Sequence, residues 1–246
     1  MRSQLGTSAK NGYSVNKFYE QSKLFQWVVG LLMLFAAGVC FGYWIELMQR
    51  SFFAILFIFI ITPIGQFLMS PFMKLTGVYK YVSPMLLIYA PSKKKYDLHN
   101  GTSFDYLFIF QRNRGGVKWQ STLLLYYIEG LLEIIREIEI GEVPESIEIR
   151  GSSYFFSDRT AQRLGFETKE TGIFEKLNII INYLDLMWMY SLSKEKLYFP
   201  RLKDVKTAST TGKKLKEKKD DLLRLKTYLK KQEPLTGRAN DVPADL

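Results

Sequence analysis

The 246-residue chain contains one cysteine and one histidine, and this scarcity excludes several classes of chemistry. Because Cys40 is alone, the chain can form neither an intrachain disulfide nor a cysteine metal cluster. His99 lies in a polar stretch and is predicted to be a surface turn residue, since a lone histidine cannot build a histidine-rich metal site. The sequence also shows no Ser/His/Asp set, no Walker-type phosphate turn and no metal-ligand spacing.

Charge is missing from two long stretches near the N-terminus, residues 24–45 and 51–73. Each stretch is long enough to cross roughly 30 Å of hydrocarbon as an α-helix, which satisfies its backbone hydrogen bonds internally. We therefore predict a two-helix transmembrane hairpin over residues 24–73 that turns at 46–50. Pro63 and Pro71 predict a kink or an early end in the second helix. A buried hairpin of a soluble protein is the alternative.

Aromatic and basic residues at the ends of these stretches predict how the hairpin sits. Trp27, Tyr43 and Trp44 stand where amphipathic rings meet lipid headgroups. Lysine and arginine precede and follow the hairpin, whereas its turn carries only Arg50, so both termini are predicted to be cytoplasmic. The chain is thus expected to be an integral protein of the inner or plasma membrane. Its net charge of +10 favours the lipid bilayer as partner over nucleic acid.

The remaining chain is predicted to form an α+β cytoplasmic domain. We divide the sequence into a cytoplasmic tail over 1–23, the hairpin, a domain over 76–200 and a basic C-terminal region over 201–246. Within the domain, two short apolar runs predict strands, Met85–Ala90 and Phe104–Phe110, separated by a polar turn over 92–103. A long helix is predicted over 119–138, where apolar residues recur every three or four positions.

A basic, glycine-bearing segment lies between the second predicted strand and this helix. Its residues are Arg112, Asn113, Arg114, Gly115, Gly116 and Val117. A turn that leads from a strand into a helix N-terminus collects free backbone N–H groups and the positive end of the helix dipole, so it favours a bound phosphate. Glycine lets an anion approach the backbone closely. An ordinary turn is the alternative.

The next segments alternate again between strand and helix patterns. Residues 146–150 alternate polar and apolar side chains, as a strand with one exposed face does. Ser157 is a suitable N-cap for a short helix that ends at Leu164, and Gly165 is the matching C-terminal residue. Residues 166–170 are predicted to be extended.

The order of these elements, with the glycine segment and the ending Leu164-Gly165-Phe166, resembles the GNAT acyltransferase superfamily over roughly residues 85–170. The resemblance implies a mixed sheet with flanking helices, and acetyl-CoA or another acyl-CoA held by residues 112–117. Three departures accompany it: Val117 replaces a glycine or alanine, Ala161 stands where the family commonly has a tyrosine acid, and the hairpin replaces the family's first elements. Tyr154 is a neighbouring substitute for the tyrosine.

Activity, where it exists, would transfer an acyl group to an amine or hydroxyl, as the resemblance implies. A carboxylate would then take the proton of the nucleophile. Glu148 and Asp105 are candidates because both fall on predicted strands, although ordinary solvent-facing residues are expected at such positions. The alternative function is a non-catalytic membrane scaffold or assembly subunit.

The C-terminal third carries an apolar segment and then a basic one. Residues 173–192 fit either amphipathic helix or a pair of strands. Residues 207–212 are predicted to be a small-residue linker, and 213–231 a basic helix with leucines on one side, which would contact anionic lipid headgroups or a protein partner. Residues 233–246 are predicted to be disordered.

Overall fold

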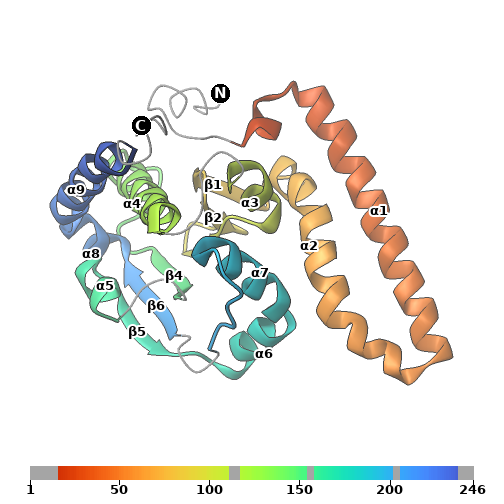
Figure 1. The fold of residues 1–246 in the computed structure, drawn as a ribbon. Coiled ribbons are helices and arrows are strands. Elements are labelled where there is room, and N and C mark those ends of the chain that lie inside the picture. Colours follow the sequence, from red (N-terminus) through yellow and green to blue (C-terminus); the bar gives the residue numbers. More distant parts are fainter. Residues whose placement is uncertain (1–15, 111–116, 154–157, 202–205, 238–246) are drawn as a thin grey trace, which may run out of the picture.

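The computed structural model describes residues 16–110, 117–153, 158–201 and 206–237. Figure 1 shows two long helices at one side of the molecule and a mixed α+β domain beside them. The first long helix, α1 (Lys23–Arg50), is followed by a short 3-10 helix, η4 (Phe52–Phe57), and by α2 (Ile58–Leu75). These spans confirm two helices long and apolar enough to cross a membrane.

The turn of the hairpin lies slightly later than predicted. Residues 46–50 are still helical, and the chain turns at Ser51, which has an extended backbone. Trp44 then donates a hydrogen bond of 2.8 Å from Nε1 to the carbonyl oxygen of Ala54, which joins the two sides of the turn. The Trp44 ring is therefore fixed at the tip of the hairpin.

Small residues let the two helices of the hairpin approach each other closely. A Cβ atom at Gly65 of α2 would lie 2.6 Å from the Phe41 ring of α1, and one at Gly30 would lie 3.1 Å from Leu75. Such contacts between small and large residues are the usual means of packing apolar helices in lipid. Pro63 and Pro71 are accommodated inside α2, so neither ends the helix.

The domain is organised around a six-stranded mixed sheet with the order β1-β2-β3-β4-β6-β5. Its strands are β1 (Tyr79–Ser83), β2 (Leu86–Tyr89), β3 (Lys95–Asn100), β4 (Glu148–Ser153), β5 (Glu167–Glu170) and β6 (Lys206–Thr211). Strands β3 and β4 pair in parallel, and the other four neighbouring pairs are antiparallel. The predicted α+β class and the strands near 85–90, 146–150 and 166–170 are thus confirmed.

Two predictions of irregular structure are wrong because each segment is a strand. The predicted turn over 92–103 contains β3, and exposed His99 lies on this strand. The predicted linker over 207–212 is strand up to Thr211, within β6, which pairs with β4 on one side and β5 on the other, and Gly212 begins the next helix. Threonine occupies half of the six β6 positions, and its branched side chain suits a strand.

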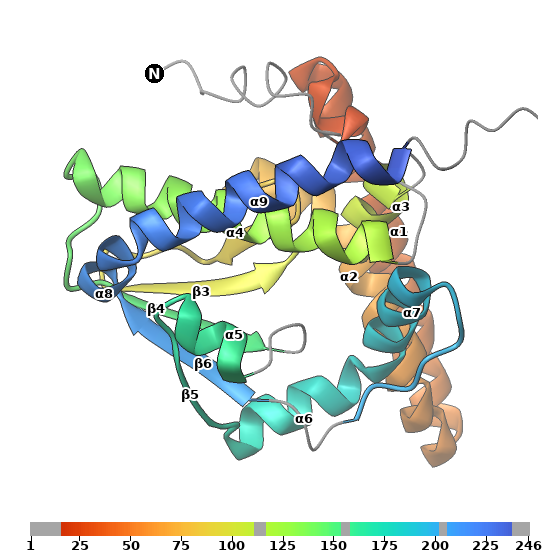
Figure 2. The same ribbon diagram turned by 60° about the vertical axis from the view of Figure 1, so that its left-hand side comes forward.

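The domain helices are α3 (Ser103–Phe110), α4 (Val117–Glu139), α5 (Asp158–Arg163), α6 (Ile173–Ile181), α7 (Tyr183–Lys194), α8 (Gly212–Glu217) and α9 (Lys219–Gly237). The long predicted helix is α4, and α9 lies alongside it over one face of the sheet (Figure 2). Residues 173–192, which fitted helix or strand, form α6 and α7.

The predicted strand over 104–110 is wrong, since these residues form α3. In α3, Leu107 and Phe108 are exposed side by side while Tyr106 and Ile109 on either side of them are completely buried. A strand alternates its faces and could not give this pattern, whereas a helix can.

Two groups of buried apolar side chains form the core. The larger joins the sheet to α4, α5, α8 and α9, and the smaller joins α3, the start of α4 and α7 around Tyr106, Trp119 and Tyr126. Leu215 and Leu222 of α8 and α9 are fully buried in the larger group. The C-terminal region is consequently packed against the same core as the strands.

Candidate functional site

The start of α4 is the place where the sequence predicts a phosphate site. Near the other end of α4, Ile138 lies close to Gly212 and to Ile147, the residue just before β4. This is seen from a Cβ atom built on Gly212, which would be 2.9 Å from Ile138 Cδ1 and 3.0 Å from Ile147 Cγ2. Helix α4 therefore begins at the opposite end of the strands, toward the carboxyl ends of β3 and β4, as Figure 2 shows. In open sheets with parallel strands, ligands bind outside such carboxyl ends.

The segment before α4 differs from the prediction in one respect. It joins two helices, α3 and α4, instead of a strand and a helix. Val117 is the first residue of α4, while Arg112, Asn113, Arg114, Gly115 and Gly116 lie outside the described residues. The helix N-terminus required by the predicted site is present directly after them.

The helix ending that contributes to the GNAT resemblance has a well-defined geometry. Gly165 has a φ of +83°, the left-handed conformation that glycine adopts most readily. The Phe166 N–H donates to the Ala161 carbonyl at 2.9 Å, and the Gly165 N–H donates to the Gln162 carbonyl at 3.0 Å. These two bonds form a Schellman motif, so Gly165 ends α5 as predicted. Ser157, the predicted N-cap, and Tyr154 lie outside the described residues.

Ala161 cannot supply the acid that the family commonly places near this point. Its methyl group is buried in the larger core group, packed with Leu164 and Phe166. The position therefore serves packing between α5 and the sheet.

Asp105 is not the exposed strand residue that was expected. It lies in the first turn of α3, is completely buried, and accepts four hydrogen bonds. The donors are Asn16 Nδ2 at 3.1 Å, the Tyr81 hydroxyl at 2.6 Å, and the backbone N–H and hydroxyl of Thr102 at 2.8 and 2.9 Å. Burial raises the pKa of this carboxyl, although the hydrogen bonds from Tyr81 and Thr102 oppose the shift.

The arrangement around Asp105 joins the domain to the segment before the hairpin. Asn16 precedes α1, Tyr81 lies on β1, and Thr102 precedes α3. Close by, Lys74 at the end of α2 places Nζ 3.1 Å from the centre of the Tyr19 ring and 4.7 Å from that of Tyr81. Asp105 therefore connects structural elements, and its lone pairs are already used.

Glu148, the other candidate base, is a solvent-facing strand residue. Its side chain is about half exposed and lies 3.7 Å from Arg150 Nε, which also lies 3.5 Å from Asp97. Such surface pairs leave the carboxylate hydrated, so nothing in the surroundings of Glu148 prepares it for proton transfer. Neither candidate base has the environment of a catalytic group.

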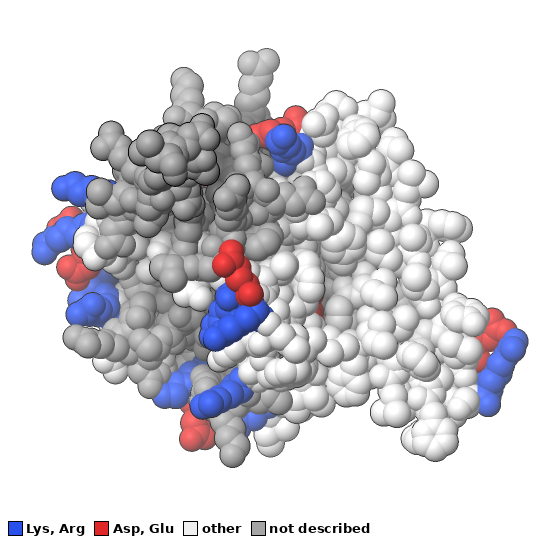
Figure 3. Space-filling view, viewed as in Figure 1, with Lys and Arg blue, Asp and Glu red and all other residues white. Residues whose placement is uncertain are grey.

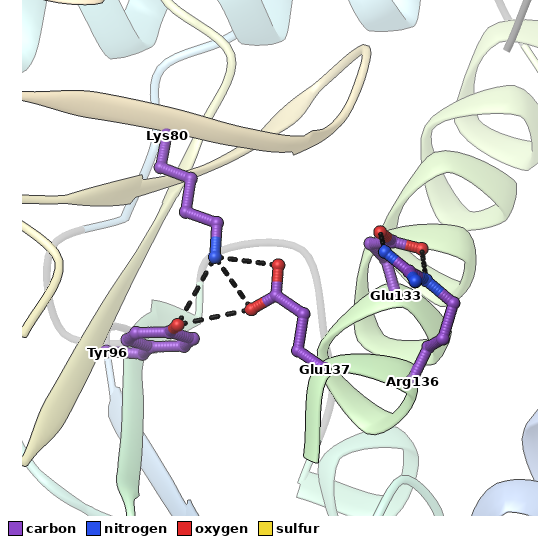
Figure 4. Close-up of polar contacts among 5 residues, drawn as sticks. All are labelled: Lys80, Tyr96, Glu133, Arg136 and Glu137. Carbon is purple, nitrogen blue, oxygen red and sulfur yellow. Dashed lines mark hydrogen bonds and ion pairs between the residues drawn. The ribbon is translucent and has the colours of Figure 1, made fainter. Parts of the chain in front are cut away.

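A buried ion pair that the sequence did not reveal connects β1 with α4 (Figure 4). Glu137 is 4 % exposed, and both of its carboxylate oxygens lie 2.7 Å from Lys80 Nζ. The Tyr96 hydroxyl on β3 donates to Glu137 Oε2 at 3.1 Å. Burial alone would lower the pKa of Lys80, but the hydrogen bond and charge of Glu137 raise it. Glu137 is one of four glutamates in α4, and no local pattern distinguishes it from the other three.

The basic helix predicted over 213–231 has its leucine side covered. It is divided at Lys218 into α8 and α9, and Leu215, Leu222 and Leu229 are buried in the core. Several of its lysines pair with acids of the domain: Lys214 with Glu167, Lys216 with Glu145, Lys219 with Glu139, and Lys226 with Glu129. Contact of this segment with anionic lipid headgroups or a protein partner stays a prediction. Such a contact would be made by its charged side, because its leucine side is buried.

No family model, no curated protein and no solved structure matches the chain. Within the described part of the chain, no group of three or more His, Cys, Asp or Glu side chains could hold a metal ion. The mixed sheet with flanking helices is compatible with the fold that the GNAT resemblance implies.

Proposed function

We propose that the chain is a membrane-anchored α+β protein that binds an acyl-CoA, or a similar phosphate-bearing ligand, at the start of α4. The observation that carries the proposal is the position of this helix. Helix α4 begins directly after the Arg/Gly segment and toward the carboxyl ends of the parallel strands β3 and β4. A 23-residue helix directs its free N–H groups and its dipole at that point.

Anchoring by the hairpin is the second part of the proposal, and the surface of the hairpin supports it. Figure 3 shows a broad uncharged surface over this side of the molecule, with charges gathered at the hairpin tip. The outward side of α1 carries only apolar or aromatic large side chains between its charged ends, among them Leu24, Leu31, Phe35 and Val39. Water solvates such an apolar surface poorly, whereas lipid hydrocarbon solvates it well.

Ligand binding is tested by titrating the full-length protein in detergent with acetyl-CoA in a calorimeter. Arg114→Glu should abolish the heat of binding. The matched control is Arg163→Glu, which changes the net charge equally at an exposed position of α5 and should leave binding intact. Equal losses in both variants would indicate only general charge attraction, and no heat from the wild type at millimolar acetyl-CoA would refute ligand binding.

A non-catalytic membrane scaffold is the second candidate function, and the two acids favour it. Asp105 is committed to four hydrogen bonds and Glu148 to a hydrated surface pair. A wild-type protein that resists carbonate extraction from membranes but binds no acetyl-CoA would support the scaffold. A protein released by carbonate without detergent would refute both candidates.

A further inference from the structure

Helices α6 and α7 present a second apolar surface, which the described residues of the domain leave exposed. Ile173 and Phe174 are 83 % and 87 % exposed, and Leu177 is about half exposed. Ile180 near the end of α6, and Leu184 and Trp188 on α7, are exposed as well. Within each helix these side chains lie three or four positions apart and so share one face. We call the exposed apolar residues of the two helices the stripe.

The opposite side of α6 determines the direction of this stripe. Ile179 is buried, and Glu175 accepts a hydrogen bond of 2.7 Å from the Thr207 hydroxyl on β6. Residues 175 and 179 are four apart and share one helix face, while 173 and 177 share the face turned away from the sheet. The sheet thus holds α6 with its apolar stripe outward.

The stripe lies next to the apolar surface of the hairpin. Helices α6 and α7 both contact α2, and Figure 1 shows them on the side of the domain that faces the hairpin. Lys176 on α6, one residue from exposed Leu177, is exposed as well. Apolar residues with a tryptophan and flanking lysines are typical of helices that lie in a membrane interface.

From this continuity we infer that the stripe on α6 and α7 rests in the lipid bilayer beside the hairpin, as a second membrane contact. This inference rests on the anchoring part of the proposed function. Its consequence is that the domain does not turn freely above the membrane. The sheet and the start of α4 are held at a fixed side of the hairpin.

The test uses full-length protein reconstituted in vesicles of phosphatidylcholine and phosphatidylglycerol. In a Cys40→Ala background, single cysteines replace Phe174 on the stripe, Phe35 on the hairpin, and Ile140 in the turn after α4. All three residues are more than half exposed, so a fluorescent thiol label should be tolerated at each. Quenching is then measured with nitroxide-bearing lipid and with aqueous iodide.

We expect the label at 174 to behave like the label at 35, with blue-shifted emission, strong quenching by nitroxide lipid and weak quenching by iodide. The label at 140 should show the reverse. If 35 reports lipid while 174 behaves like 140, the second contact is refuted and anchoring stands. If all three labels report water, anchoring itself fails. A parallel label at Leu177→Cys guards against local disturbance at 174, and it must agree with 174.

Discussion

Replacing Glu137 by glutamine tests whether the buried ion pair holds β1 against α4. The variant keeps the volume of the side chain but removes the charge that faces Lys80 Nζ at 2.7 Å. Breaking a buried pair by removing one partner costs about 3–5 kcal/mol. Because the Lys80 side chain is 36 % exposed, water compensates it in part, and we expect a loss of about 2–3 kcal/mol.

The neighbouring pair on the same helix provides the matched control (Figure 4). Glu133 binds Arg136 through Oε2 and Nε at 2.9 Å, but both side chains are more than one third exposed. The Glu133→Gln variant should therefore lose no more than about 1 kcal/mol. In a chain of this length, these losses lower the thermal midpoint by about 5–10 °C for Glu137→Gln and by less than about 4 °C for Glu133→Gln.

The assay is thermal unfolding of the full-length protein in detergent, followed by far-UV circular dichroism. A double variant, Lys80→Met with Glu137→Leu, should recover a large part of the loss, because it leaves no buried charge without a partner. Equal midpoints for Glu137→Gln and Glu133→Gln would refute the reasoning. The reasoning would also be refuted if the double variant lost more unfolding free energy than the sum of the losses in Lys80→Met and Glu137→Leu alone.

Three further predictions concern pH, the Asp105 centre and the end of α5. The pKa of Lys80 is raised above its ordinary value of 10.5, so the ion pair stabilises the fold fully below pH ~10.5 and loses this effect as pH rises through the higher folded-state pKa. The difference in thermal midpoint between wild type and Glu137→Gln should therefore narrow at high pH, and a difference that stays constant would contradict this. Asp105→Ala should lower the unfolding free energy by about 3 kcal/mol or more, measured as a fall in thermal midpoint, because the hydrogen-bond donors around Asp105 would stay buried without an acceptor. An unchanged midpoint would show that these donors find other acceptors. Gly165→Ala should cost about 1–2 kcal/mol in the same assay, since φ is +83° and the new Cβ would lie 2.9 Å from a lysine Cγ. The control Gly172→Ala should change the midpoint less, because φ is −65° there and the nearest atom would lie 3.9 Å from the new Cβ; equal effects would refute the conformational argument.

Long patterns in the sequence predicted their elements well, and short ones did not. The hairpin helices were identified by two long uncharged apolar runs, and α4 by apolar residues that recur every three or four positions over many turns. The run Phe104–Phe110 is too short for this, because a helix segment buried on most sides and a buried strand have the same apolar composition. Its helical state depends on contacts with the start of α4 and with α7.

Strands β3 and β6 could not be recognised locally because their stability comes from distant partners. Strand β3 is polar and lies between β2 and β4, and β6 pairs with β4 about 60 residues earlier in the chain. Their sequences, KYDLHN and KTASTT, contain few large apolar residues, so neither shows the apolar run or alternation that marks a strand locally. Pairing partners decide such cases, and a single sequence does not show them.

The sequence located local turn and cap signals but not the long-range contacts of the charged side chains. The glycine segment and the ending at Gly165 were identified from turn and cap residues, which act locally. The roles of Asp105 and Glu137 depend on Tyr81 and Lys80, which lie 24 and 57 residues away in the chain. No local pattern records such pairings.

The position of β6 has a consequence for how the protein is made. Strands β4 and β5 do not pair with each other, and each bonds to β6, which is the last strand to be synthesised. Until Thr211 has left the ribosome, both strands therefore expose unpaired edges, which are prone to aggregate. The hairpin emerges long before that point, so under the proposed anchoring the growing chain is tethered while its sheet is still open.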